Sequence, residues 1–142
     1  LSMRALMAKE RPPRHPFDLK LAPGGLVDLE FIAQSAQLVS RDTVAAPQAP
    51  IDEVLRRLGE TGLVPNGERL AEIHALYSTV LQVMSAALAD PFKDEGWTEA
   101  FRELLAQRTN TPNFERLASD IREMESEVSA AAEAWYAKAR EL

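Results

Sequence analysis

The last part of the chain carries an apolar residue at every third or fourth position. These residues are Phe114, Leu117, Ile121, Met124, Val128, Ala131 and Trp135. Steps of three and four keep the side chains on one face of an α-helix, so this segment is predicted to be a long amphipathic helix. Such a repeat is typical both of a coiled-coil dimer and of packing inside a helical bundle.

Several other segments show helical spacing, which favours the bundle. They are residues 25–41, a short segment that begins at Ile51 and closes near Gly59 or Gly62, a long segment from the N-cap Asn66 to about Ala89, and a segment from Trp97 to Leu105. The final helix is expected to start with Thr111 as its cap and Pro112 in its first turn. One more short helix is expected over residues 1–10, before the prolines of RPPRHP end it.

Strand alternation is missing from the sequence except at Phe17 to Lys20, which is interpreted as a short extended run. We therefore expect an all-α fold. It is predicted to be a bundle of about five helices, with a long C-terminal helix and a short extended N-terminal segment.

Charge and composition exclude several functions. The formal net charge of -6 argues against general nucleic-acid binding, which needs a broad basic surface. Residues 1–20 nevertheless hold five basic side chains and two acidic ones, so this end either binds phosphate or docks on the protein's own acidic surface. The absence of cysteine excludes disulfides and fits a cytoplasmic location. No apolar run is long enough to cross a bilayer, so no membrane is expected as a partner. Because of the net charge, no nucleic acid is expected as a partner either.

No self-sufficient catalytic motif is present in the sequence. His15 and His74 lack a Glu at the Glu-x-x-His spacing of carboxylate-bridged metal sites. There is no Gly-x-Ser-x-Gly elbow, no phosphate loop and no dinucleotide fingerprint. We therefore expect no catalytic residue and no metal ligand in this chain.

Two carboxylates near the start of the helix at 25–41 require a geometric test. Asp28 and Glu30 point about 200° apart on a regular helix, so they cannot hold one metal ion together. Asp28 falls inside the apolar stripe beside Ile32, in a first turn whose free amides and positive helix end stabilise a carboxylate. Glu30 and Gln34 face solvent or another domain. Spacing alone favours a structural role for Asp28 over a functional one.

The stretch FDLKLAPGGLVDLEFIAQ, Phe17 to Gln34, resembles a motif of the glutamine synthetase adenylyltransferase family, bacterial enzymes that attach and remove AMP on glutamine synthetase. The motif is Lys, then after several residues Gly-Gly-(Leu/Ile)-x-Asp-x-Glu-Phe-(Ile/Leu)-x-Gln. The matching residues are Lys20, Gly24, Gly25, Asp28, Glu30, Phe31 and Gln34. The flanking MRALMAKERPPRHP and LRRLGETGLVP also resemble this family, so the resemblance covers most of the chain. The related uridylyltransferases of nitrogen signalling carry a similar motif.

The resemblance implies a C-terminal helical domain that follows the adenylylating nucleotidyltransferase domain. Residues 1–20 would then be a linker, with a short helix and an extended segment from the catalytic domain, and residues 21–142 the helical bundle domain. Magnesium and ATP are implied as cofactors of the full-length enzyme. The family's Gly-Ser element and its magnesium-holding Asp-x-Asp pair are absent here, so the fragment is expected to be inactive and to bind neither cofactor tightly. The implied partners are its own nucleotidyltransferase domain, glutamine synthetase and the PII signalling protein.

The resemblance also names candidate residues close to the nucleotide or at a domain interface: Lys20, Gly24, Gly25, Asp28, Glu30 and Gln34. The two glycines would permit a tight turn and a close backbone approach. Lys20 would neutralise a triphosphate. Asp28 and Glu30 would brace the domain junction from opposite sides of their helix. Two alternatives stay open, a free-standing helical interaction module that uses the final helix, and the helical domain of a related protein uridylyltransferase.

Overall fold

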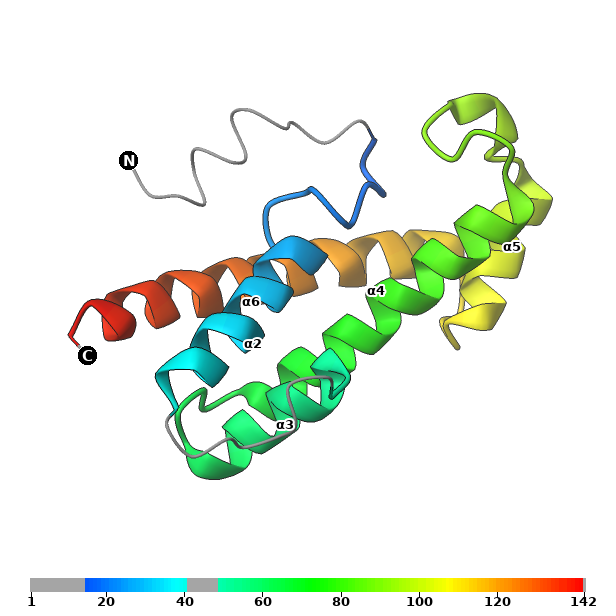
Figure 1. Ribbon diagram of the computed structural model, residues 1–142. Helices are drawn as coiled ribbons and strands as arrows, with labels where there is room; N and C mark the ends of the chain where they lie inside the picture. Colours follow the sequence, from blue (N-terminus) through cyan, green and yellow to red (C-terminus); the bar gives the residue numbers. More distant parts are fainter. Residues whose placement is uncertain (1–14, 41–48, 142) are drawn as a thin grey trace.

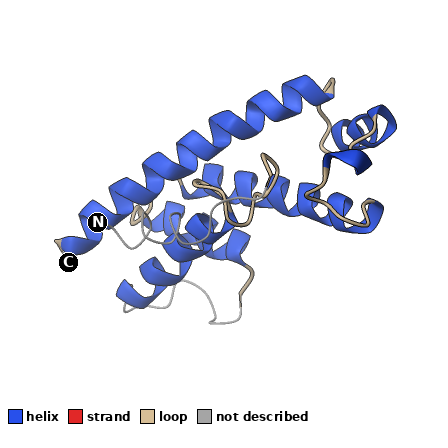
Figure 2. Ribbon diagram, turned by 90° about the horizontal axis from the view of Figure 1, so that it is seen from above, coloured by secondary structure: helices blue, strands red, loops and turns tan. Residues whose placement is uncertain are grey.

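The computed structural model describes residues 15–40 and 49–141. Its elements are α2 (Leu26–Val39), α3 (Ile51–Thr61), α4 (Gly67–Ala87), the short 3-10 helix η1 (Asp94–Gly96), α5 (Glu99–Arg108) and α6 (Phe114–Arg140). These described ranges contain no strand (Figure 2). The predicted all-α fold of about five helices with a long C-terminal helix is confirmed. The short helix predicted over residues 1–10 lies outside the described residues.

Helix α6 runs along the full length of the molecule, and α2 and α5 pack against it (Figure 1). Helices α3 and α4 are joined by a short loop and form the most extensive helix pair. Helix α2 contacts α3, α4 and α6, whereas α5 contacts α4 and α6 at the end of the molecule away from the C-terminus. No described helix is both long and apolar enough to span a membrane.

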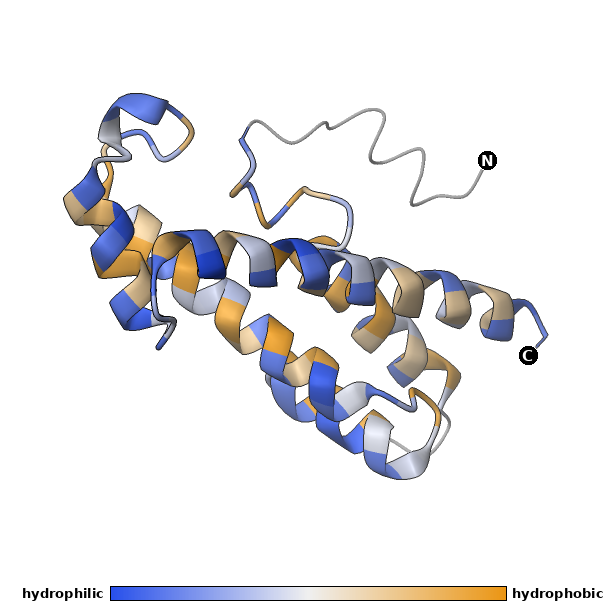
Figure 3. Ribbon diagram, turned by 180° about the vertical axis from the view of Figure 1, so that it is seen from behind, coloured by the Kyte–Doolittle hydropathy of each residue, from blue (hydrophilic) through white to orange (hydrophobic). Residues whose placement is uncertain are grey.

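One hydrophobic core joins all five α-helices. Large side chains without exposed surface come from every helix and include Leu29, Ile32, Leu55, Leu58, Leu70, Ile73, Tyr77, Leu105 and Leu117. Hydrophobic and hydrophilic residues alternate along α6, the long helix that ends at the C label in Figure 3. The repeat that predicted this helix places Leu117, Ile121, Val128 and Trp135 in the shared core, as the bundle interpretation requires.

The helix ends correct one detail of the sequence analysis. Gly62 closes α3 in the left-handed conformation with φ of 80°, as predicted. Asn66 occupies the predicted N-cap position of α4, but its side chain makes no capping hydrogen bond. The predicted Thr111 cap of α6 is wrong, because the Asn113 side chain accepts the Arg116 amide at 2.7 Å and α6 begins after it. Thr111 instead donates its hydroxyl to the Ala106 carbonyl at 3.1 Å and closes the end of α5.

The predicted extended run from Phe17 to Lys20 is also wrong, since this segment folds into consecutive turns. The Asp18 amide donates to the His15 carbonyl at 2.9 Å, and the Ala22 amide donates to the Asp18 carbonyl at 3.0 Å. A lone segment without a strand partner satisfies its backbone groups locally in this way. Phe17, Asp18 and Leu19 are all buried in succession, so burial does not alternate here as it would in a half-buried strand.

Candidate functional site at the start of helix α2

The turns before α2 fold back and cap its first turn with backbone carbonyls. The Leu26 amide donates to the Leu19 carbonyl at 2.7 Å, and the Val27 amide donates to the Lys20 carbonyl at 3.2 Å. The Gly25 amide donates to the Ala22 carbonyl at 2.8 Å. These amides, which a helix start usually leaves without partners, are therefore already engaged inside the chain.

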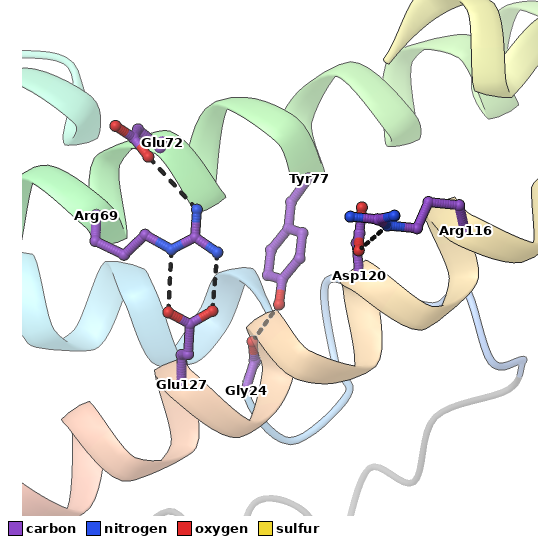
Figure 4. A network of polar contacts seen from close by, with 7 residues as sticks. All are labelled: Gly24, Arg69, Glu72, Tyr77, Arg116, Asp120 and Glu127. Carbon is purple, nitrogen blue, oxygen red and sulfur yellow. Dashed lines mark hydrogen bonds and ion pairs between the residues drawn. The ribbon is translucent and has the colours of Figure 1, made fainter. Parts of the chain in front are cut away.

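Gly24 is the point at which three helices meet. Its amide donates to the Asp28 carboxylate at 2.6 Å, and its carbonyl accepts the Tyr77 hydroxyl of α4 at 3.0 Å (Figure 4). Its φ of 79° lies in the left-handed region, and a Cβ added there would lie 2.1 Å from the Glu125 carbonyl oxygen of α6. Only glycine combines this conformation with so close a backbone approach.

Gly25 is required for a different reason. Its φ of -90° suits any residue, but an added Cβ would lie 2.1 Å from the Leu19 carbonyl oxygen. That carbonyl is the same one that accepts the Leu26 amide, so the turn and the helix start touch at this residue. The glycine pair thus holds α2 against the preceding turn on one side and against α6 on the other.

Burial and nearby charges shift the pKa values of two side chains beside the glycine pair, Tyr77 and Glu125. Burial raises the pKa of the Tyr77 hydroxyl well above its ordinary value, and the neighbouring Glu125 adds to this effect. Burial also raises the pKa of Glu125 to about 7, with Arg122 acting in the opposite direction. Tyr77 therefore remains a neutral donor to Gly24 at physiological pH.

An ion pair joins α4 to α6 next to this seam. Arg69 donates from Nε and Nη2 to the two carboxylate oxygens of Glu127, at 3.0 and 2.9 Å, and it also faces Glu72 at 3.5 Å (Figure 4). The hydrogen bonds from Arg69 lower the pKa of Glu127. The fork geometry fixes the lateral position of the two helices around Tyr77.

The C-terminal half of α2 is held to α6 by two more contacts. The Trp135 indole nitrogen donates to the Ser35 hydroxyl at 2.8 Å. The Phe31 ring stacks on the Tyr136 ring with a centroid separation of 5.1 Å. Helix α2 is therefore held to α6 beside its start and again at Phe31 and Ser35.

An aromatic cluster anchors the segment before the glycine turn. The His15 ring stacks on Trp97 at 4.8 Å, and the Phe17 ring lies 5.0 Å from Trp97 and 5.4 Å from Phe114. The His15 Nδ1 accepts the Phe17 amide at 3.0 Å, while Nε2 faces the Asp94 carboxylate at 3.2 Å. His15 thus has a packing role. His74 pairs with Asp52, which joins α4 to α3.

The structure divides the candidate residues into two groups. Gly24, Gly25 and Asp28 form the helix entry, but the amide that Asp28 accepts belongs to Gly24, which lies before the N-cap Gly25 and outside the first turn of the helix. Lys20 and Gln34 are exposed and Glu30 is half-buried, so these three side chains point away from that network. No group of three His, Asp or Glu side chains that could hold a metal occurs in residues 15–40 and 49–141.

Sequence reasoning missed two members of the site. It placed Tyr77 in the core of α4 without its hydroxyl contact to Gly24, which joins residues 53 apart in the chain. It did not select Glu125, although this residue lies four positions after Ile121 and so at the edge of the apolar stripe of α6. Asp18, a buried carboxylate with 1% exposure, also escaped selection because its segment was interpreted as extended.

The fold and the site together define an all-α domain in which a glycine pair, a carboxylate and a buried tyrosine fix one helix on the others. A family model described as GlnD PII-uridylyltransferase matches residues 2–135. The chain is 37% identical over 136 residues to the bifunctional glutamine synthetase adenylyltransferase/adenylyl-removing enzyme of Caulobacter vibrioides, a match covering 94% of this chain and 14% of that protein. Proteins with the same name in Brucella suis and Mesorhizobium japonicum are each 36% identical, over 122 and 129 residues, covering 85% and 89% of this chain. They are matched over 12% and 13% of their own length.

The chain belongs to the family of this PII-uridylyltransferase model and of the glutamine synthetase adenylyltransferases, so the resemblance of its motif is confirmed. It spans only 12% to 14% of the length of these three relatives. No solved structure gives a significant match.

Proposed function

We propose that this chain is the C-terminal helical domain of a bifunctional glutamine synthetase adenylyltransferase, and that it supports AMP transfer by its neighbouring nucleotidyltransferase domain. The observation that carries the proposal is the division of the family motif. Gly24, Gly25 and Asp28 make contacts inside the domain, whereas Lys20 and Gln34 of the same motif are exposed to solvent. Residues that pack inside and residues that face outward, within one motif, fit a rigid platform for another domain.

In this proposal the chemistry belongs to the rest of the polypeptide. The full-length enzyme binds ATP and magnesium in its nucleotidyltransferase domain and transfers AMP to glutamine synthetase. The helical domain supplies no metal ligand. Its exposed Lys20 ammonium lies one turn before the glycine pair, where it adds a positive charge beside the anionic nucleotide. Excised from the enzyme, the chain is inactive.

The helix start itself is a poor phosphate site, which favours a packing role inside the helical domain for the glycines. The amides of Gly24, Gly25, Leu26 and Val27 all donate to acceptors within the chain. A phosphate at a helix N-terminus needs such amides to be available. Lys20 is therefore the candidate residue best placed to approach the nucleotide.

The names of the relatives favour adenylylation over uridylylation as the reaction of the parent protein. The three relatives described above are named as adenylyltransferases that also remove AMP, and each matches at least 85% of this chain. The uridylyltransferase name comes from a family model that matches residues 2–135. The full-length protein is accordingly expected to use ATP and glutamine synthetase.

The test replaces Lys20 in the full-length protein and follows AMP incorporation into glutamine synthetase with ATP and magnesium. Lys20→Ala is expected to lower the rate by about 10- to 150-fold, since a charge-assisted contact contributes about 1.5 to 3 kcal/mol. The control is Lys93→Ala, which removes another exposed lysine, on the loop before η1, and should leave the rate unchanged. Equal rates for both variants, with equal KM for ATP, would refute the role of Lys20.

The wider proposal has its own test. The full-length protein is expected to transfer AMP to glutamine synthetase, and the 142-residue chain alone to transfer none. A full-length protein that transfers UMP to a PII protein and no AMP would establish the uridylyltransferase alternative. Transfer by the 142-residue chain would show that the chemistry does not need another domain.

A further inference from the structure

Helix α2 is the source of all the large hydrophobic side chains that are exposed in the described part of the chain. They are Phe31, Leu38 and Val39, with exposed fractions of 37%, 86% and 40%. Single exposed hydrophobic residues are common on protein surfaces, but their confinement to one helix requires an explanation.

Two of these residues, Phe31 and Leu38, lie in a stripe along α2 with the half-buried Val27 and the exposed Gln34. At 100° per residue, Val27, Phe31, Gln34 and Leu38 all fall within about 60° of one another, because their spacings are four, three and four. The buried residues Leu29, Ala33 and Ala36 lie on the opposite side and face the bundle core. Helix α2 is thus apolar on two opposite faces, a pattern typical of helices buried on both sides.

The stripe continues onto α6. The Phe31 ring stacks on the half-buried Tyr136 at a centroid separation of 5.1 Å, so the aromatic surfaces of the two helices adjoin. Gln34 lies between the apolar side chains and offers both a donor and an acceptor. Apolar anchors around one amide are an arrangement found at protein interfaces.

We propose that the stripe of Val27, Phe31, Gln34 and Leu38, extended by Tyr136, is the surface on which the nucleotidyltransferase domain of the same polypeptide docks. This inference rests on the proposed function and adds the residues of the contact, most of which lie outside the candidate positions. Chain length and the size of the stripe indicate this occupant. The relatives are matched over only 12% to 14% of their length, so most of such a polypeptide lies outside this chain.

The size of the stripe favours a tethered partner over a second copy. A stable complex between separate proteins usually buries about 1,200 to 2,000 Å² in total, more than a few side chains on one helix provide. A domain joined to α2 by the polypeptide itself has an effective concentration of about millimolar, so a small apolar contact is sufficient. An interface within one chain also tolerates a polar residue such as Gln34.

Cysteine accessibility in the full-length protein tests the docking directly. The 142 residues contain no cysteine, so Leu38→Cys introduces a single thiol into this part of the protein. Trypsin cleavage after Lys20 and Arg41 isolates that thiol in one peptide, whatever cysteines occur elsewhere. The matched control is Glu103→Cys, which replaces an exposed residue of α5. The rate of maleimide labelling of each thiol is measured in native buffer and in concentrated urea.

Docking predicts that native structure slows labelling at Leu38→Cys at least about tenfold, and at Glu103→Cys less than about twofold, because thiol reactivity follows access. Equal labelling of both thiols would overturn the inference. Protection that disappears on dilution of the protein would assign the stripe to a second copy, and protection that appears only with glutamine synthetase would assign it to that partner. Either result would also overturn it.

A photoreactive benzoylphenylalanine at Phe31 identifies the occupant. The expected cross-link joins this position to the nucleotidyltransferase domain of the same polypeptide, and a cross-link to any other region overturns the inference. AMP transfer measured on the same protein separates the two proposals. Transfer without protection at residue 38 refutes the docking alone, whereas protection without transfer refutes the proposed function.

Discussion

Replacing Gly24 with alanine is the sharpest perturbation of the α2 helix entry. The added methyl group meets two obstacles. The φ of 79° is a left-handed conformation that alanine disfavours, and the Cβ would lie 2.1 Å from the Glu125 carbonyl oxygen and 2.7 Å from its carbon. The obstacle is backbone of the long helix α6, which cannot rotate away as a side chain would.

The two obstacles contribute separately to the change in the free energy of unfolding. The left-handed conformation costs a residue with a Cβ about 1 to 2 kcal/mol. Inserting a methyl group into a tight contact costs about 1 to 3 kcal/mol, because α2 and α6 must separate. Gly24→Ala is therefore expected to lower the free energy of unfolding by about 2 to 5 kcal/mol, a large part of the stability of a typical domain.

Urea unfolding followed by circular dichroism measures this loss, and Gly62→Ala is the matched control. Gly62 has nearly the same φ, 80°, but no atom lies within 4 Å of its added Cβ. The control therefore carries the conformational cost without the collision. With a slope of about 2 kcal/mol per molar urea, Gly24→Ala should lower the midpoint by about 1 to 2.5 M and Gly62→Ala by about 0.5 to 1 M.

The difference between the two variants is the informative quantity, because it cancels the cost of the backbone conformation. Equal midpoints for Gly24→Ala and Gly62→Ala would mean that α6 does not approach Gly24 closely, and the account of the glycine pair as a junction of helices would be refuted. A change in slope for either variant would indicate a change in the unfolded or folded ensemble instead of a simple loss of stability.

Three further predictions concern the side chains around this junction. Tyr77→Phe removes the hydroxyl that donates to the Gly24 carbonyl and should lower the free energy of unfolding by about 1 to 3 kcal/mol in urea titrations, because a buried acceptor loses its donor. A double-mutant cycle on Arg69 and Glu127 should give a coupling of only about 0.5 to 1 kcal/mol that weakens in high salt, since both side chains are about 40% exposed; a coupling that is insensitive to salt would contradict this account. The pKa of Glu125 is raised to about 7 in the folded protein, so the folded state binds this proton more tightly than the unfolded state does. The protonated carboxyl therefore contributes its full stabilisation below about pH 4.5, and this stabilisation is lost as the pH rises through 7. The free energy of unfolding of Glu125→Gln, minus that of the unsubstituted protein, should therefore rise by about 1 kcal/mol between pH 5 and pH 8. A difference that is the same at both pH values would refute the raised pKa.

The helices could be predicted from the sequence because their apolar residues repeat with a regular period. The repeat from Leu117 to Trp135 defined α6, and Gly62 and Asn66 marked the turn between α3 and α4 as they stand in the structure. The errors fell where local chemistry offers alternatives. Asn113 and Thr111 are both good N-caps, and only the geometry of the α5 end decides which of them serves α6.

The candidate site could be predicted only in part, because its contacts join distant parts of the chain. The sequence identified Gly24, Gly25 and Asp28 as a helix start whose two glycines let other backbone segments approach closely. It gave no signal that the Tyr77 hydroxyl or the Glu125 carbonyl would be the approaching groups, since 53 and about 100 residues separate them from Gly24. The turns from Phe17 to Lys20 were misassigned because the apolar-polar alternation of four residues does not distinguish a strand from turns, and the polar residue between the apolar ones, Asp18, is itself buried.

The two halves of the family motif depend on each other through the rigidity of α2. Gly24 holds the start of the helix on α6 and α4, and the Trp135 bond to Ser35 holds its C-terminal half, so the stripe that contains Phe31 and Leu38 is presented in one orientation. A variant that loosens the entry should therefore weaken docking without altering any docking residue. If Gly24→Ala and Leu38→Ser act on the same contact, their effects on AMP transfer by the full-length protein will be less than additive, because the first variant has already displaced the surface that the second one damages.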